Sequence, residues 1–197
     1  MSEELLAIVR NVKRLAALHR VGLLDTPPED TFDRLTALAR RILKVPVAYV
    51  SLVDRDRQFF KSCAGLPEPW ATQRETPLSH SFCKHVVASG APLVVDDARR
   101  HPTVWNNLAI DELGIVAYAG IPLTTSDGQT IGTFCTVDSQ PRTWTWDEVE
   151  ILKDLAAIVM GHIELRWIAR ESDAARAKAE ARARTLEQRV STEGAPS

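Results

Sequence analysis

The strongest structural signal in the chain lies at residues 114–138, which read GIVAYAGIPLTTSDGQTIGTFCTVD. Two β-rich runs within it, 116–123 and 130–138, flank the pair Asp127-Gly128. Because a tight hairpin turn needs a positive φ angle, which glycine adopts without steric cost, this pair predicts a β-hairpin. Both runs carry apolar residues at odd and even positions, whereas a strand with one wet face alternates. The sequence therefore predicts strands that are covered on both faces.

Length, charge and cysteine content limit the class of protein. The 197 residues suffice for one domain with a sizeable core plus extensions, and the formal net charge is −2. No basic cluster stands out, which argues against a nucleic-acid groove or an anionic membrane surface. Three widely spaced cysteines do not suggest a disulfide framework, and the acidic N-terminus has no signal-peptide pattern. We expect a cytoplasmic protein without nucleic-acid or membrane partners.

The apolar pattern divides the chain into three parts. Residues 1–22 carry an apolar stripe at helical spacing, which predicts one amphipathic helix used for dimerisation. Residues 23–168 form the expected domain, which includes the first half of a long C-terminal helix. A capping box at Thr145 and Glu148 begins that helix, and unbroken helix formers predict roughly 45 residues. Residues 169–197 are expected to be a charged, alanine-rich extension of the helix with a flexible tail.

Local signals predict the remaining elements. Thr26, Pro27 and Glu29 predict a helix start, with Thr26 as the N-cap. Further strands are expected over 47–54, 58–64 and 91–98, a short helix over 82–89, and a loop over 65–78.

Seven short pieces of the chain together resemble a GAF domain of a bacterial signalling subgroup, and the match covers about residues 14–154. The pieces are LLDTPPE at 23–29, VSLVD at 50–54, QFFKS at 58–62, SFCKH at 81–85, VVDDA at 94–98, YAGIPL at 118–123 and IGTFCTVD at 131–138. They occur in the family's order and spacing. The resemblance implies an α+β fold with a central six-stranded antiparallel sheet, helices from both chain ends on one face, and a small-molecule pocket on the other.

The resemblance also implies where a ligand would bind. The candidate pocket residues are those near the family's ligand side: Phe60, Phe82, Cys83, His85, Trp105, Tyr118 and Cys135. The aromatic members of this set either line such a pocket or fill it.

Two cofactor hypotheses are disfavoured. Cys83 and His85 are two residues apart, which on a helix points their side chains about 200° from each other, so we expect no metal site. In the similar cyanobacteriochrome domains, the bilin-attachment cysteine lies in the stretch that corresponds to residues 102–114. That stretch contains no cysteine here, so we expect no bilin, and the cofactor stays unknown.

Three classes of function remain open. The first is a sensory or regulatory module of a bacterial signal-transduction protein, such as a two-component system, which binds a small molecule or senses redox state. Its terminal helices would relay the signal to a histidine kinase, diguanylate cyclase or phosphatase. The second is a structural dimerisation module without a ligand. The third is a thiol enzyme of the free methionine sulfoxide reductase type, whose cysteine pattern does not match, so we expect no catalytic residues.

The long helix predicts a parallel homodimer with a coiled coil, because its apolar residues exceed what one sheet face covers. The expected interface residues are Leu5, Val9, Val12, Leu152, Leu155, Val159, Ile163 and Trp167.

Overall fold

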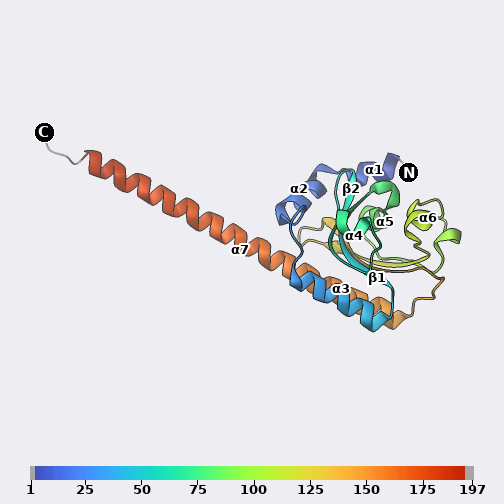
Figure 1. Ribbon diagram of the computed structural model, residues 1–197. Coiled ribbons are helices and arrows are strands. Elements are labelled where there is room, and N and C mark those ends of the chain that lie inside the picture. The colour runs from blue at the N-terminus through green and yellow to red at the C-terminus, as the bar shows by residue number, and fades with distance from the viewer. Residues whose placement is uncertain (1–2, 194–197) are drawn as a thin grey trace.

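A six-stranded antiparallel sheet with strand order β3-β2-β1-β6-β5-β4 forms the centre of the fold (Figure 1). The computed structural model describes the backbone of residues 3–193 and the side chains up to residue 184, apart from residue 183. The strands are β1 Val47–Val53, β2 Arg57–Ala64, β3 Glu75–Pro77, β4 Leu93–Val95, β5 Ala117–Thr124 and β6 Thr130–Asp138. The helices are α1 Glu3–Val9, α2 Val12–Val21, α3 Asp30–Leu43, α4 Trp70–Gln73, α5 Cys83–Ser89, α6 Ala109–Leu113 and α7 Trp146–Glu193, with short 3₁₀ turns η1 Leu78–His80 and η2 Ala98–Arg100. The expected α+β fold is confirmed.

The predicted hairpin joins β5 to β6. Its register runs from Ala117 opposite Asp138 to Thr124 opposite Thr130. Gly128 adopts a φ angle of 79°, and its N–H donates to the carbonyl oxygen of Thr125 at 2.8 Å. The connection is therefore a five-residue loop, 125–129, whose left-handed position is the glycine that the sequence supplies there.

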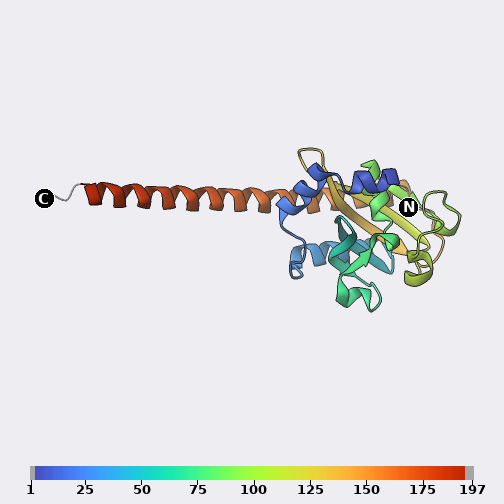
Figure 2. The same cartoon turned by 90° about the horizontal axis from the view of Figure 1, so that it is seen from above.

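The central strands bury both of their faces, as the sequence predicted. In β1, Ala48, Val50 and Leu52 belong to one apolar core, while Tyr49 and Val53 belong to another on the opposite side. Helices α2, α3 and α7 cover the first side, and α1, α5 and α6 cover the second (Figures 1 and 2). We call these the back and front faces of the sheet.

The N-terminal segment differs from the single helix expected over residues 1–22. The helix is interrupted after α1 because the Asn11 side chain caps α2, accepting hydrogen bonds from Lys13 N at 2.9 Å and Arg14 N at 3.2 Å. Helix α2 packs on α7 at the back of the sheet, whereas α1 packs on α5 at the front. Within the N-terminal segment, only α2 therefore lies on the same face as α7, and the segment crosses from front to back.

The start of α3 was also predicted wrongly. The helix begins at Asp30, and the Thr26 hydroxyl caps nothing but donates to the carbonyl oxygen of Leu23 at 2.7 Å. Within the predicted loop 65–78 lie α4 and β3, which are too short to leave a periodic pattern in the sequence.

Five of the eight expected dimer-interface residues are buried inside one chain. They are each at most 5% exposed: Val9, Leu152, Leu155, Val159 and Ile163. Val9 packs in the front core, and the other four pack against the back of the sheet. Val12 is 80% exposed, and Leu5 and Trp167 are half-buried.

Helix α7 begins with the predicted capping box and extends far beyond the rest of the molecule (Figures 1 and 2). Thr145 N donates to the Glu148 carboxylate at 2.9 Å, and Glu148 N donates to the Thr145 hydroxyl at 3.2 Å. The flexible tail predicted at the end of 169–197 falls, from residue 194 on, outside the described residues. Across residues 3–193, we find no helix with the length and apolar character needed to cross a membrane.

A fully buried lysine ties β2 to the N-terminus of α3 and to α7. The Lys61 ammonium donates to the Thr26 hydroxyl at 2.7 Å, the Pro27 carbonyl oxygen at 2.7 Å and the Glu29 carboxylate at 2.6 Å. Glu29 in turn pairs with Arg166 on α7. All three ammonium hydrogens therefore have acceptors, and an acidic partner balances the buried charge.

Replacing Lys61 with methionine is expected to destabilise the fold by about 2–4 kcal/mol, because it leaves buried acceptors unpaired. The matched control is Lys153→Met, which breaks an exposed pair with Glu150 and is expected to cost less than about 0.5 kcal/mol. Urea unfolding of both variants measures the difference. Equal decreases in the free energy of unfolding for the two variants would contradict a structural role for Lys61 and its acceptors.

Candidate functional site

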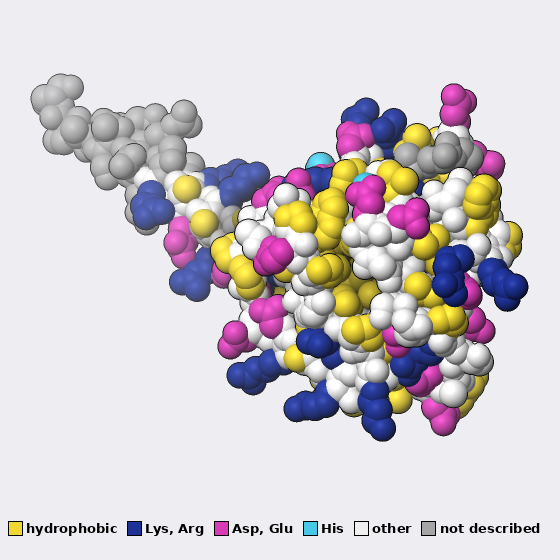
Figure 3. Space-filling view, turned by 45° about the vertical axis from the view of Figure 1, so that its right-hand side comes forward, with side chains coloured by type: hydrophobic (Ala, Val, Ile, Leu, Met, Phe, Trp, Pro, Cys, Tyr) yellow, Lys and Arg dark blue, Asp and Glu magenta, His cyan; other side chains and the backbone are white. Residues whose placement is uncertain are grey.

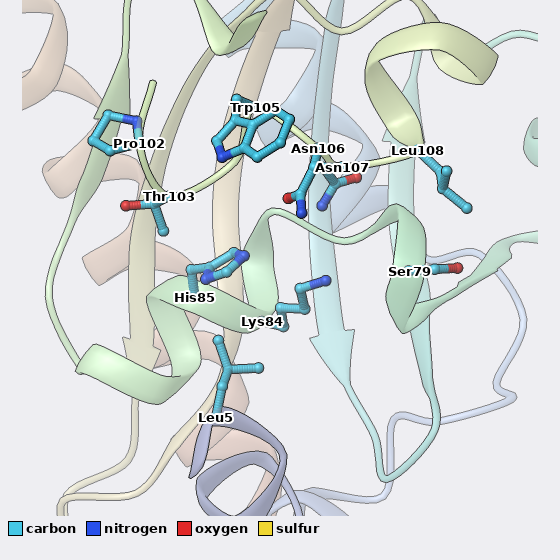
Figure 4. Close-up of a pocket in the computed structure, with 10 residues that line it drawn as sticks. All are labelled: Leu5, Ser79, Lys84, His85, Pro102, Thr103, Trp105, Asn106, Asn107 and Leu108. Atoms are coloured by element: carbon cyan, nitrogen blue, oxygen red, sulfur yellow. The ribbon is translucent and has the colours of Figure 1, made fainter. Parts of the chain in front are cut away.

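A cavity of about 380 Å³ opens on the front face, between α5 and the loop that follows η2. Its walls come from α1, η1, α5 and residues 102–108 (Figure 4). The lining residues are Leu5, Ser79, Lys84, His85, Pro102, Thr103, Trp105, Asn106, Asn107 and Leu108. Lys84 and His85 extend from α5 toward the loop that carries Trp105 and the two asparagines (Figure 4).

Polar contacts hold the two walls of the cavity together. The Ser81 hydroxyl donates to the Gln58 side chain at 2.5 Å and accepts from Lys84 N at 3.1 Å, which fixes α5 against β2. The Asn107 amide nitrogen donates to the Ser81 carbonyl oxygen at 3.1 Å, and its oxygen accepts from Ala109 N at 3.0 Å. The loop over the cavity is thus anchored to the segment that begins α5.

Lys84 places a positive charge at the inner wall of this cavity. The residue is 5% exposed, and its ammonium donates to the carbonyl oxygen of Leu78 at 2.7 Å. Burial lowers the pKa of Lys84 to about 8, so the group is still mostly protonated at neutral pH. Among the side chains that the structure describes, no carboxylate lies within ion-pair distance of this ammonium.

His85 lies beside Lys84 and is half-buried. Burial, and then the positive charges of Lys84 and His101, lower the pKa of His85 to about 4. At neutral pH its imidazole is therefore uncharged and can both donate and accept a hydrogen bond. The cavity wall combines one cation with a neutral polar ring.

Two of the seven predicted pocket residues, His85 and Trp105, line the cavity. The other five lie beneath it, each at most 1% exposed: Phe60, Phe82, Cys83, Tyr118 and Cys135. They fill the space between the sheet and α5, so the hollow lies outside a packed front core and not directly on the sheet. Gly120 makes room for this packing, because a Cβ atom there would lie 2.1 Å from the Tyr118 hydroxyl oxygen.

Sequence reasoning missed Lys84, which is the most chemically specific residue of the cavity. Its signal was a lysine within the run Phe82-Cys83-Lys84-His85-Val86-Val87, where most neighbours are apolar. Helix α5 buries four of its seven residues, and a lysine among the buried ones must either pair with an acceptor or lie at a site that can bind one.

Two buried thiols meet at the bottom of the front core. Cys83 Sγ lies 3.8 Å from Cys135 Sγ, and the Tyr118 hydroxyl donates to Cys83 Sγ at 3.3 Å. Burial raises the pKa of both thiols, while donors around Cys83, led by Cys135, Ser51 and Thr133, lower its pKa below its usual range. The pair is therefore asymmetric, with Cys83 the more acidic thiol. Within the described residues, no group of three potential metal ligands converges.

One face of the molecule carries side chains of both charge signs (Figure 3). On the face that Figure 3 shows, acidic and basic side chains alternate over the described part of the molecule. This distribution matches the formal net charge of −2.

Comparison with known proteins assigns the family. The GAF domain profile matches residues 27–163, and the chain belongs to the GAF domain family. It is 32% identical over 152 residues to cyclic di-GMP phosphodiesterase PA2567 of Pseudomonas aeruginosa. That alignment covers 76% of this chain and 25% of the phosphodiesterase, so the chain spans about a quarter of that relative's length.

Solved structures share the fold at low sequence identity. A domain of a two-component sensor histidine kinase protein from Sinorhizobium meliloti superposes with a TM-score of 0.57 at 21% identity, covering 75% of this chain and 97% of that domain. Free methionine-R-sulfoxide reductase from Neisseria meningitidis superposes with a TM-score of 0.58 at 19% identity, covering 86% and 95%. The same architecture therefore occurs in signalling proteins and in an enzyme.

Proposed function

We propose that the chain is a sensory input module and not a catalyst, and that it relays occupancy of the α5 cavity through its terminal helices. The observation that carries this proposal is a continuous path of contacts from the cavity to α7. The chain aligns with about a quarter of a cyclic di-GMP phosphodiesterase. This similarity supports the proposal that the output partner or domain is a phosphodiesterase, cyclase or kinase. A cytoplasmic location fits such partners.

The path begins at α1, whose Leu5 lines the cavity. Arg14 at the start of α2 is buried, and its guanidinium donates to the carbonyl oxygens of Val9 at 2.7 Å and Val53 at 2.8 Å. These bonds connect α1, α2 and β1 at one point. A shift of α1 is therefore transmitted to α2.

The second half of the path joins α2 to α7. The Arg170 guanidinium donates to the carbonyl oxygens of Val21 at 3.3 Å and Gly22 at 3.2 Å. The Arg20 guanidinium lies 4.6 Å from the centre of the Trp167 ring. Both contacts lie where α7 leaves the body of the molecule, so a displaced α2 would change the direction or register of the extension.

Homodimerisation through α7 is part of the proposal. The large apolar residues Ile158, Leu165 and Ile168 are 53%, 69% and 57% exposed. Together with Gly161, where an added Cβ would meet nothing within 4 Å, they recur three and four residues apart, which is coiled-coil spacing. Because the large residues lie in the first half of α7, a parallel pair matches them with each other, whereas an antiparallel pair does not. We call this set the α7 stripe.

Replacing Leu165 with glutamate is expected to convert the dimer to a monomer at about 20 µM, because a charge at a seam costs roughly 2–3 kcal/mol per chain. Val12→Glu is the matched control, since Val12 is also exposed but lies on the N-terminal segment. Size-exclusion chromatography with light scattering gives the mass. A wild-type monomer, or dissociation by the Val12 change alone, would rule out the α7 stripe as the interface.

Redox sensing is a second candidate function, and the contact between Cys83 and Cys135 favours it. With hydrogen peroxide as oxidant, the Cys83 thiolate attacks one oxygen and forms a sulfenic acid. The hydroxide that leaves takes up the proton lost by the thiol and becomes one water. The Cys135 thiol then displaces the sulfenic oxygen as a second water, and the S–S bond forms. The two sulfurs lose two electrons, and the peroxide is reduced. Both thiols are buried, so α5 must open for the oxidant to enter.

Peroxide treatment is expected to give an intramolecular Cys83–Cys135 disulfide, detected by peptide mass spectrometry and reversed by dithiothreitol. Cys63→Ser keeps the product, whereas Cys83→Ser and Cys135→Ser each remove it. If oxidation occurs only at Cys63, the redox function is wrong and the ligand-sensing proposal is unaffected. Turnover of free methionine sulfoxide with a thioredoxin system would instead identify an enzyme.

A further inference from the structure

Two buried lysines, Lys61 beside α3 and Lys84 on α5, differ in how their charges are balanced. Lys61 has three acceptors, one of which is the Glu29 carboxylate. Lys84 has one acceptor, the Leu78 carbonyl oxygen, and no acidic partner among the described residues. A buried ammonium carries three donors and a full charge, so Lys84 retains the capacity to bind an acceptor that Lys61 has already used.

The cavity around Lys84 has no negative charge of its own. None of its ten lining residues is an aspartate or glutamate. The Glu112 carboxylate lies on α6 and pairs with His80 Nε2 at 3.0 Å. Lys84 is therefore the charged residue of the cavity lining, with neutral donors on His85 and Asn106 beside it (Figure 4).

The outer wall of the cavity presents an exposed indole and an exposed leucine beside its polar residues. The Trp105 side chain is 61% exposed although it is the largest side chain of the wall, and Leu108 is 45% exposed. Trp105 faces Lys84 and His85 across the opening (Figure 4). Covering the exposed face of an indole removes apolar surface from water, which lowers the free energy. Aromatic rings stack on such a face in offset or edge-on geometry. The cavity volume of about 380 Å³ lies within the range of small-molecule sites.

We infer that the cavity binds a small organic anion, with a carboxylate or phosphate oxygen on Lys84 Nζ and a planar group against Trp105. This inference rests on the proposed function, because it names the ligand class of the same cavity. The charge-assisted hydrogen bond selects the anion, and the indole selects the flat body. Nothing else in the lining distinguishes carboxylate from phosphate, so the experiment must do so.

The experiment compares three probes of similar shape: benzoate, phenyl phosphate and the neutral benzamide. Binding to the full chain is followed through the indole N–H signal of Trp105 in ¹⁵N–¹H spectra at constant ionic strength. At least one anion is expected to bind tenfold or more tightly than benzamide, and the preferred anion identifies carboxylate or phosphate as the head group. Lys84→Met is expected to remove the difference, while Lys153→Met keeps it.

The folding of Lys84→Met is checked by its unfolding curve, since methionine fills the same volume without the charge. Equal affinity for the anions and benzamide, or an unchanged preference in Lys84→Met, would overturn the anion assignment and leave a sensor of neutral ligands. If none of the three probes shifts Trp105 or its neighbours at 10 mM, ligand binding at this cavity fails together with the assignment. If Lys84→Met does not fold, Lys84→Gln takes its place in the experiment, and the same results are expected or would overturn the assignment.

Discussion

Burial of both faces of the central strands is the constraint from which the rest of the structure follows. Because β1 and β6 present apolar side chains in both directions, neither face can be left to water, and helices must cover each. The back is closed by α3 and the first half of α7, and the front by α5 and its neighbours. The side chains of the front core are buried against one another, and the cavity between α5 and the loop of Trp105 lies outside this core.

The crossing of the N-terminal segment gives this arrangement its regulatory potential. A chain whose first 22 residues formed one helix would touch only one face. The cap at Asn11 breaks the helix, so that α1 reaches the cavity while α2 reaches α7. The buried Arg14 spans the break through the carbonyl oxygens of Val9 and Val53. One short segment is therefore in contact with both the candidate sensor site and the helix proposed for output.

Several individual elements were predictable because their signals are local, whereas the six-stranded sheet and its helix layer were expected from the resemblance to the GAF family. The hairpin at Gly128 and the capping box at Thr145 each depend on residues within one turn. The apolar stripe of residues 1–22 predicts one continuous helix, whereas the cap at Asn11 ends the first helix there. The buried contacts of Arg14 with Val9 and Val53 favour the interrupted form. The first half of α7 carries apolar residues both on the side buried against the sheet and on the exposed side. The sequence pattern alone therefore does not tell which of them meet the sheet. Lys84 was missed because the sequence shows a lysine within an apolar run but not that its ammonium is buried without an acidic partner among the described residues.

Amide hydrogen exchange of an Arg14→Met variant measures whether α1 and α7 are coupled. If the path of contacts is correct, exchange becomes faster in α1, in α2 and in the part of α7 around Trp167 and Arg170, while the β5–β6 hairpin keeps its protection. Faster exchange confined to α1 would mean that the cavity and the output helix are independent. Loss of protection throughout the sheet would mean that Arg14 serves only stability.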